Sequence, residues 1–201
     1  MKELKQHSRR AAVAPALFLG RLGFTPNALT IVGSVLTASV GILVANGWFT
    51  AAGVCLWIFS ATDTLDGALA RATDRVTTFG AFLDSVCDRV AEACVFFGLL
   101  WYYQSTGNTL GVALTYIALV GSLMVSYSRA RAEGVGLQAA EVGWFQRPER
   151  IIALGIGLLL APILPQALVL ILALLAVLTT VTVFQRVLHV AHTLAGLTRD
   201  P

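Results

Sequence analysis

The stretch DTLDGALARATDRVTTFGAFLDSVCDRV, residues 63–90, decides how this chain folds, because it places regularly spaced acids between long apolar segments. Asp63 and Asp66 are three residues apart, so in a helix with ~100° of rotation per residue they share one face. Asp84 and Asp88 are four residues apart and share a face of the following helix. If the two helices are antiparallel neighbours joined by a short turn, the four carboxylates converge.

The composition is that of an integral membrane protein. The 201 residues are 57% hydrophobic and only 12% charged, with a mean hydropathy of +0.77, which is far more apolar than a soluble domain. A helix needs about 20 apolar residues to cross the hydrocarbon, so the length allows about six crossings. The net charge of +3 does not form a basic stripe interleaved with aromatic residues, which excludes a nucleic-acid partner. We expect an all-α membrane protein.

The apolar runs predict six transmembrane helices and one helix at the membrane surface. Residues 2–20 reach Arg21 before they complete a span, so they predict an amphipathic helix that lies in the interface. The second crossing must continue into the Asp63 region to reach the opposite face, because its own apolar run is short. The six runs cover residues 28–47, 48–62, 79–103, 110–130, 150–164 and 166–188.

The distribution of charge predicts the topology. Three of the turns contain no charged residue, whereas the N-terminus, the C-terminus and residues 71–75 and 129–150 contain nearly all of the Lys and Arg residues. Lys and Arg favour the cytoplasmic side, so both termini and the aspartate site are predicted to face the cytoplasm in a multi-pass protein of the cell membrane. We expect a single domain over residues 1–201, with a juxtamembrane helix in residues 1–21 and a six-helix bundle in residues 26–192.

Four converging carboxylates repel each other and require protons or cations. Carboxylate oxygens suit hard divalent ions, so we expect Mg²⁺ or Mn²⁺, and two ions would balance four acids. Two such ions can hold both oxygens of a phosphoryl displacement, which predicts a phosphate ester or anhydride as substrate. Gly67 and Gly80 lack side chains and let phosphates approach the helix backbone, and Arg71 is placed to contact a phosphate oxygen.

The pattern DxxDGxxAR(x8)GxxxDxxxD fixes eight positions over residues 63–88, and it resembles the motif of the CDP-alcohol phosphotransferases. The resemblance implies that Asp63, Asp66 and Asp84 bind the metal ions. It implies that Asp88 both binds a metal ion and acts as the general base. An alcohol oxygen then attacks the β-phosphorus of a CDP-lipid, and CMP leaves. The expected contacts to CDP-diacylglycerol are Pro26, Asn27, Ala28, Leu29, Gly67, Arg71, Thr77 and Gly80.

Arginines far along the chain suggest the acceptor. Arg129 and Arg131 end the predicted fourth span and Arg150 opens the fifth, on the side where the aspartates are expected. Arginine suits bidentate phosphate capture, so we expect a phosphorylated acceptor rather than a bare alcohol. The alternative is that these arginines mark positive-inside topology and extend their head groups into water.

A branch of the family narrows the choice of acceptor. Three segments resemble the actinobacterial phosphatidylinositol phosphate synthases: SYSRARAE (residues 126–133), RPERIIAL (residues 147–154) and TVTVFQRVLHV (residues 180–190). The third segment adds Arg186 as a fourth phosphate contact. Those relatives often have Lys in place of Arg129 and an acid in place of Gln146. The resemblance implies that inositol 1-phosphate is the acceptor, giving phosphatidylinositol phosphate and CMP. The nearest rival is a phosphatidylglycerophosphate synthase that uses glycerol 3-phosphate.

Two further expectations concern assembly and an alternative function. The resemblance implies a homodimer with one active site per protomer, surrounded by membrane lipids. Acids within a membrane helix bundle could also belong to a divalent-cation transporter. Transport needs a polar path across the bilayer, yet the acids are predicted at the cytoplasmic half and none lines the outer half. The sequence therefore favours an enzyme.

Overall fold

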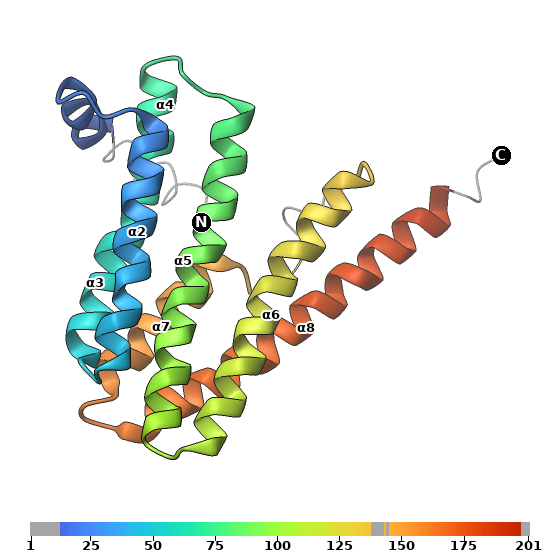
Figure 1. Ribbon diagram of the computed structural model, residues 1–201. Helices are drawn as coiled ribbons and strands as arrows, with labels where there is room; N and C mark the ends of the chain where they lie inside the picture. The colour runs from blue at the N-terminus through green and yellow to red at the C-terminus, as the bar shows by residue number, and fades with distance from the viewer. Residues whose placement is uncertain (1–12, 138–142, 144, 198–201) are drawn as a thin grey trace. The chain divides into compact units, whose positions relative to one another are not determined.

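The computed structural model of the protein describes residues 13–137, 143 and 145–197, and within them every regular element is a helix (Figure 1). The all-α prediction is confirmed. Residues 13–21 form the first helical segment. The others are α2 (Pro26–Ala45), α3 (Phe49–Ala61), α4 (Asp63–Ala72), α5 (Thr78–Ser105), α6 (Thr109–Gly134), α7 (Arg147–Leu160) and α8 (Pro165–Leu197).

Three helices are long and apolar enough to cross a membrane: α2, α6 and residues 165–195 of α8. They coincide with the first, fourth and sixth predicted spans. α3 has 13 residues and α7 has 14, both short of the ~20 that a crossing needs. α5 has 28 residues, but Asp84, Asp88, Arg89 and Glu92 interrupt its apolar character. The chain is thus an all-helical membrane protein, and the other three crossings stay predictions.

The chain divides into two compact units, residues 1–98 and residues 99–201, with α5 passing from the first into the second. In the first unit, the 13–21 helix packs on α4, where Ala16, Ala68 and Leu69 are fully buried. Part of the predicted juxtamembrane helix is therefore helical, while residues 1–12 lie outside the described residues. Its place in the membrane interface stays a prediction.

The start of α2 is fixed by local chemistry. Thr25 caps the helix by accepting a hydrogen bond of 3.2 Å from the backbone N–H of Ala28, and Pro26 occupies the first turn, where its missing N–H costs nothing. Further along α2, a Cβ added at Gly33 would lie 2.6 Å from the Thr62 hydroxyl. This glycine lets α2 approach the junction between α3 and α4.

The aspartates lie on two helices of the first unit that run in opposite directions. Figure 1 shows the chain turning between α4 and the first part of α5. Asp74 in this turn adopts a positive φ of 54°, a conformation that Asp tolerates better than most residues. α5 packs closely on α2, because Gly41 lies against the backbone of Cys94 and Gly98 lies against that of Gly41.

In the second unit, α8 packs against both α6 and α7. Gly121 of α6 lies against Thr179 of α8, so the absence of a side chain brings these helices together. Ahead of α7, Gly143 has a φ of 100°, which favours glycine, and the N–H of Phe145 donates a 3.3 Å hydrogen bond to the Thr182 hydroxyl. The segment before α7 is thereby held on α8.

Candidate functional site

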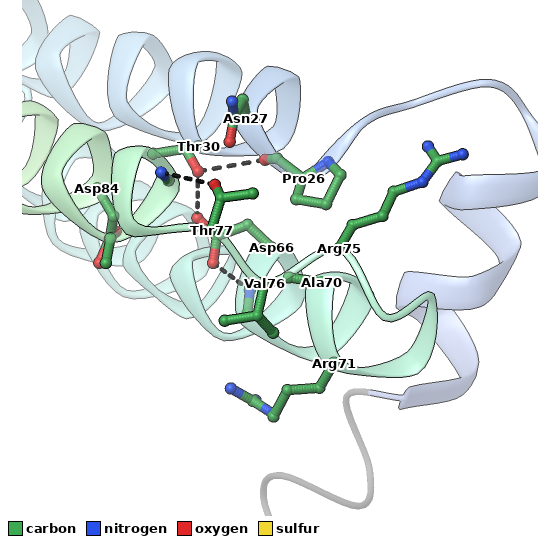
Figure 2. A pocket seen from close by; sticks show the side chains of 13 residues that line it. Pro26, Asn27, Thr30, Asp66, Ala70, Arg71, Arg75, Val76, Thr77 and Asp84 are labelled. Carbon is green, nitrogen blue, oxygen red and sulfur yellow. Dashed lines mark hydrogen bonds between the residues drawn. The ribbon is translucent and has the colours of Figure 1, made fainter.

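A cavity of about 280 Å³ opens in the first unit where α2 begins, α4 ends and α5 starts (Figure 2). Six of the eight residues predicted to contact the CDP-lipid line it, together with two of the four motif aspartates. The site is therefore built from segments that are distant in sequence. The full lining consists of Pro26, Asn27, Thr30, Asp66, Gly67, Ala70, Arg71, Arg75, Val76, Thr77, Gly80, Ala81 and Asp84.

The two motif glycines make room for polar side chains at the edge of this cavity. A Cβ at Gly80 would lie 3.0 Å from the Thr77 hydroxyl oxygen and 3.2 Å from Oδ1 of Asn27. A Cβ at Gly67 would lie 3.2 Å from Nη1 of Arg71. Each glycine thus lets a side chain that can bind a ligand lie directly over the helix backbone.

Thr77 has a structural role beside its predicted contact. Its hydroxyl oxygen accepts a 2.9 Å hydrogen bond from the N–H of Gly80, which caps the first turn of α5. A hydroxyl that accepts in this way can still donate its own hydrogen. The cap therefore fixes Thr77 at the cavity without removing it as a donor to a phosphate oxygen.

Asp66 is the most constrained acid of the site. It is only 7% exposed, and Thr30 lies with its hydroxyl 2.5 Å from one carboxylate oxygen, Oδ2. The backbone N–H of Gly67 donates a 2.5 Å hydrogen bond to the other oxygen, Oδ1.

The remaining motif acids are placed differently. Asp84 is half-buried and lines the same cavity, and the charges of Asp84 and Asp63 both act on Asp66. Asp63 lies near the α2 surface at Gly33 rather than in the lining. Asp88 is buried one helical turn beyond Asp84, outside the lining, with its carboxylate 4.0 Å from Nη1 of Arg89.

The carboxylates do not form a closed cage in the part of the chain that the structure describes. No group of three or more His, Cys, Asp or Glu side chains there is gathered tightly enough to hold an ion alone. Asp66 and Asp84 nevertheless offer hard oxygen ligands to one cavity. Mg²⁺ commonly uses one or two protein carboxylates and completes its shell with water and substrate phosphates, so this donor set fits such an ion.

Two predicted contacts lie outside the cavity. The N–H of Ala28 donates to the Thr25 hydroxyl, and Leu29 packs against the cluster of Ala16, Ala68 and Leu69. These residues secure the start of α2 and the 13–21 helix rather than forming the cavity wall.

Sequence reasoning missed five members of the lining: Thr30, Ala70, Arg75, Val76 and Ala81. Thr30 had a detectable signal. It stands three residues after Asn27, so the two share a helix face, and it is polar within a strongly apolar helix. Arg75 and Val76 belong to the turn before α5, where no periodicity indicates which side chains face inward.

The arginines form a second polar centre, within the second unit. Arg150 and Arg186 are each only 2% exposed, and the charges of Arg129 and Arg150 act on Arg186. Arg186 donates to the backbone carbonyl of Val125, which anchors it between α8 and α6. Three of the four predicted acceptor contacts are thus brought together.

The other members of this region lie at its exposed edge. Arg129 forms an ion pair of 2.9 Å with Glu133 on the same helix. Arg131 is exposed and is not among the charges that act on Arg186. Gln146, where the resembling synthases often have an acid, ends the segment before α7, and its backbone N–H donates a 3.1 Å hydrogen bond to Glu149. Gln146 therefore stands at the N-cap of the helix that carries Arg150.

Comparisons with known proteins are consistent with the motif. A family model for CDP-alcohol phosphatidyltransferase matches residues 24–193. The chain is 43% identical over 134 residues to phosphatidylinositol phosphate synthase of Mycobacteroides abscessus, covering 66% of this chain and 60% of that protein, less than two thirds of its length. It is 41% identical over 171 residues to archaetidylinositol phosphate synthase of Pyrococcus horikoshii, covering 84% of this chain and 85% of that protein.

Two solved structures of Mycobacterium tuberculosis phosphatidylinositol phosphate synthase are similar in fold, each with a TM-score of 0.84 and 37% identity. One has CDP-DAG bound, and the similarity covers 90% of this chain and 94% of that chain. The other is in complex with manganese and citrate, and the similarity covers 89% of this chain and 88% of that chain.

Proposed function

The chain belongs to the CDP-alcohol phosphatidyltransferase family, whose model matches most of its length, and we propose that it transfers the phosphatidyl group of CDP-diacylglycerol to inositol 1-phosphate. The products are phosphatidylinositol phosphate and CMP. The observation that carries this proposal is the cavity of the first unit, which gathers Asp66, Asp84 and six predicted donor contacts. A fold-level relative has CDP-DAG bound, which supports the same donor here.

The acceptor is supported by what the relatives have in common. The M. abscessus and P. horikoshii proteins are named for different lipids, phosphatidyl and archaetidyl, but both names contain inositol phosphate. The shared part of the product is the head group. Both relatives therefore support inositol phosphate as the acceptor. Only the M. abscessus protein, named for a phosphatidyl lipid, supports diacylglycerol in the donor.

Metal ions would be held by the carboxylates of Asp63, Asp66, Asp84 and Asp88, as two Mg²⁺ or Mn²⁺ ions per site. A relative in complex with manganese supports a divalent ion, and the oxygen ligands of Asp66 and Asp84 suit one. Such ions neutralise the negative charge of the diphosphate when they are bound. The protein positions them by holding the Asp66 carboxylate at both of its oxygens.

Side chains of the protein bind the donor and accept the proton. Arg71 and Thr77 hold the diphosphate of the donor at the two glycines. Asp88 accepts the proton of the acceptor hydroxyl while that oxygen forms a bond to the β-phosphorus. The bond between this phosphorus and the bridging oxygen breaks, and CMP leaves with the electron pair. The lipid stays in the membrane with its new head group.

The arginine centre binds the phosphate of the acceptor. Arginines that only mark topology keep their guanidinium groups in water. Arg150 and Arg186 are instead buried in one region, and this concentration of positive charge suits the phosphate of the acceptor. Arg129 completes this set, and Arg131 acts from its exposed edge.

The proposed membrane arrangement has six crossings, three of them formed by the helices that are long and apolar enough to cross. α3 together with the start of α4, α5 and α7 supply the other crossings, which places both termini and the aspartates on the cytoplasmic side. The 13–21 helix lies in the interface as part of a single domain, and two chains associate as a homodimer. Cross-linking in native membranes tests this association.

Parallel acceptor assays test the proposal. Purified protein receives CDP-diacylglycerol, Mg²⁺ or Mn²⁺, and one of four acceptors: inositol 1-phosphate, glycerol 3-phosphate, serine or inositol. We expect CMP release with inositol 1-phosphate alone, because the arginine centre requires a phosphate and the relatives share inositol. Consumption of glycerol 3-phosphate alone would overturn the acceptor but keep the reaction class.

A further inference from the structure

A second cavity, of about 220 Å³, lies in the first unit against the 13–21 helix. It is formed by that helix, the start of α2, the end of α4 and the turn that follows α4. Within the described ranges of the chain, its lining combines cationic and apolar side chains and contains no acid. The lining residues are Leu17, Gly20, Arg21, Phe24, Pro26, Leu69, Thr73 and Arg75.

Two arginines from separate segments supply the positive charge of this cavity. Arg21 ends the 13–21 helix and Arg75 lies in the turn after α4, and both are exposed. Among the described residues, neither arginine takes part in an ion pair. Two guanidinium groups that share a cavity without a carboxylate favour an anion with several oxygens, and phosphate matches their fork-shaped donors.

The opposite wall of the cavity is apolar. Leu69 is only 1% exposed and belongs to the packed cluster under the 13–21 helix, whereas Leu17 and Phe24 remain about two fifths exposed, at 38% and 40%. A small inorganic anion would leave this wall unused. An amphipathic ligand with a phosphate at one end and a hydrocarbon chain at the other would contact both walls.

The position of the cavity along the chain points to the same ligand. It lies directly before α2, the first helix that is long and apolar enough to cross. The end of a crossing helix is where phospholipid head groups meet the protein, and basic residues there attract anionic lipids. We propose that this cavity binds the head-group phosphate of an anionic membrane phospholipid, with an acyl chain along Leu17 and Phe24.

This lipid site is distinct from the donor cavity, although the two share Pro26 and Arg75. Figure 2 shows Arg75 extending away from Asp84, in a different direction from Arg71. Neither Asp66 nor Asp84 lines the lipid site. Arg21 lines only the lipid site, so a change at Arg21 separates the two. The bound lipid is a component of the membrane and is not consumed.

Lipid retention measured by native mass spectrometry tests the site without any substrate. Full-length protein in detergent micelles receives phosphatidylglycerol, phosphatidylcholine or inorganic phosphate. We expect phosphatidylglycerol to be retained over phosphatidylcholine, because the choline charge offsets the phosphate. The variant Arg21→Gln should retain roughly fivefold less phosphatidylglycerol, the effect expected from one arginine near the surface. Arg21→Lys keeps the charge and should lose less.

The matched control is Arg147→Gln, which removes one positive charge from a half-buried arginine that lines neither cavity and is assigned to neither substrate. It should retain phosphatidylglycerol as the unmodified protein does. Equal losses in Arg21→Gln and Arg147→Gln would overturn the site in favour of general surface charge. Equal retention of both lipids, or displacement of phosphatidylglycerol by inorganic phosphate, would also overturn it. None of these results depends on the transferase reaction, so they are separable from the proposed function.

Discussion

At the scale of single residues, the candidate site depends on how the Asp66 carboxylate is held. One oxygen lies 2.5 Å from the Thr30 hydroxyl and the other accepts from the Gly67 N–H. A carboxylate fixed at both oxygens is pre-oriented toward an ion, and such supporting hydrogen bonds tune metal affinity. Thr30 is therefore a positioning residue for the carboxylate that we propose as a metal ligand.

Replacing Thr30 tests this role. Thr30→Val keeps the shape of the side chain but removes the hydroxyl, so the affinity for Mn²⁺ should fall roughly 10- to 100-fold. Thr30→Ser restores the hydroxyl and should recover most of the affinity. Binding is followed through the electron paramagnetic resonance signal of free Mn²⁺ in the absence of substrate. Equal affinities for the valine and serine variants would contradict the role of the hydroxyl.

Asp88 provides a separate test of the chemistry. Asp88→Asn keeps the size of the side chain but cannot accept the acceptor proton, so turnover should fall by about 10²- to 10⁴-fold. Binding of CDP-diacylglycerol should be largely retained, because Asp88 lies outside the donor cavity. Turnover is measured as CMP release, and donor binding by calorimetry. A variant with near-normal turnover would remove Asp88 as the base.

The sequence predicted most of this site because its members follow helical spacing. Asp66, Gly67 and Arg71 were identified from the motif and line one cavity. Ala28 and Leu29 were included as part of a continuous segment, but at ~100° per residue a helix cannot turn four consecutive residues toward one side. Thr30, which shares the cavity face of α2 with Asn27, was missed because the prediction followed consecutive residues instead of helical spacing.

At the scale of helices, the site depends on the close approach of α2 and α5. Gly41 of α2 lies against the backbone of Cys94, and Gly98 of α5 lies against the backbone of Gly41. Asn27 and Gly80, near the other ends of the same helices, are neighbours in the cavity wall. The packing of the two helices therefore sets the width of the donor cavity.

A methyl group at Gly41 should disturb this packing. The Cβ of Gly41→Ala would collide with the Cys94 carbonyl, a backbone atom that cannot move aside cheaply, so we expect a loss of about 1–3 kcal/mol in stability and a lower Tm. Gly134→Ala is the matched control, because a Cβ there meets nothing within 4 Å. Thermal unfolding in detergent measures both. A Tm for Gly41→Ala equal to that of the control would contradict the close contact.

Helix prediction was accurate for long apolar runs and weaker where charged residues interrupt them. The runs that became α2, α6 and α8 are apolar along their length. The predicted second crossing is instead divided into α3 and α4 at Thr62, and the third carries acids inside α5. Hydropathy cannot distinguish a crossing from a partly polar helix at such places, because the acids of the candidate site lower the mean hydropathy of the helix that carries them.

At the scale of the whole molecule, the aspartates and the arginines, which we propose to serve the donor and the acceptor, lie in different units of the chain. The first unit contains the aspartates and the donor cavity, and the second contains the arginine centre. The acceptor is therefore expected to depend on the second unit and the donor on the first.

The lipid product tests the central claim most directly. Purified protein with Mg²⁺ is given CDP-diacylglycerol and inositol 1-phosphate, and the extracted lipid is examined by ³¹P nuclear magnetic resonance. We predict a new lipid with one phosphodiester and one phosphomonoester, formed in equal amount to CMP. A lipid fraction without the phosphomonoester, or CMP release that does not require inositol 1-phosphate, would contradict the transfer that we propose.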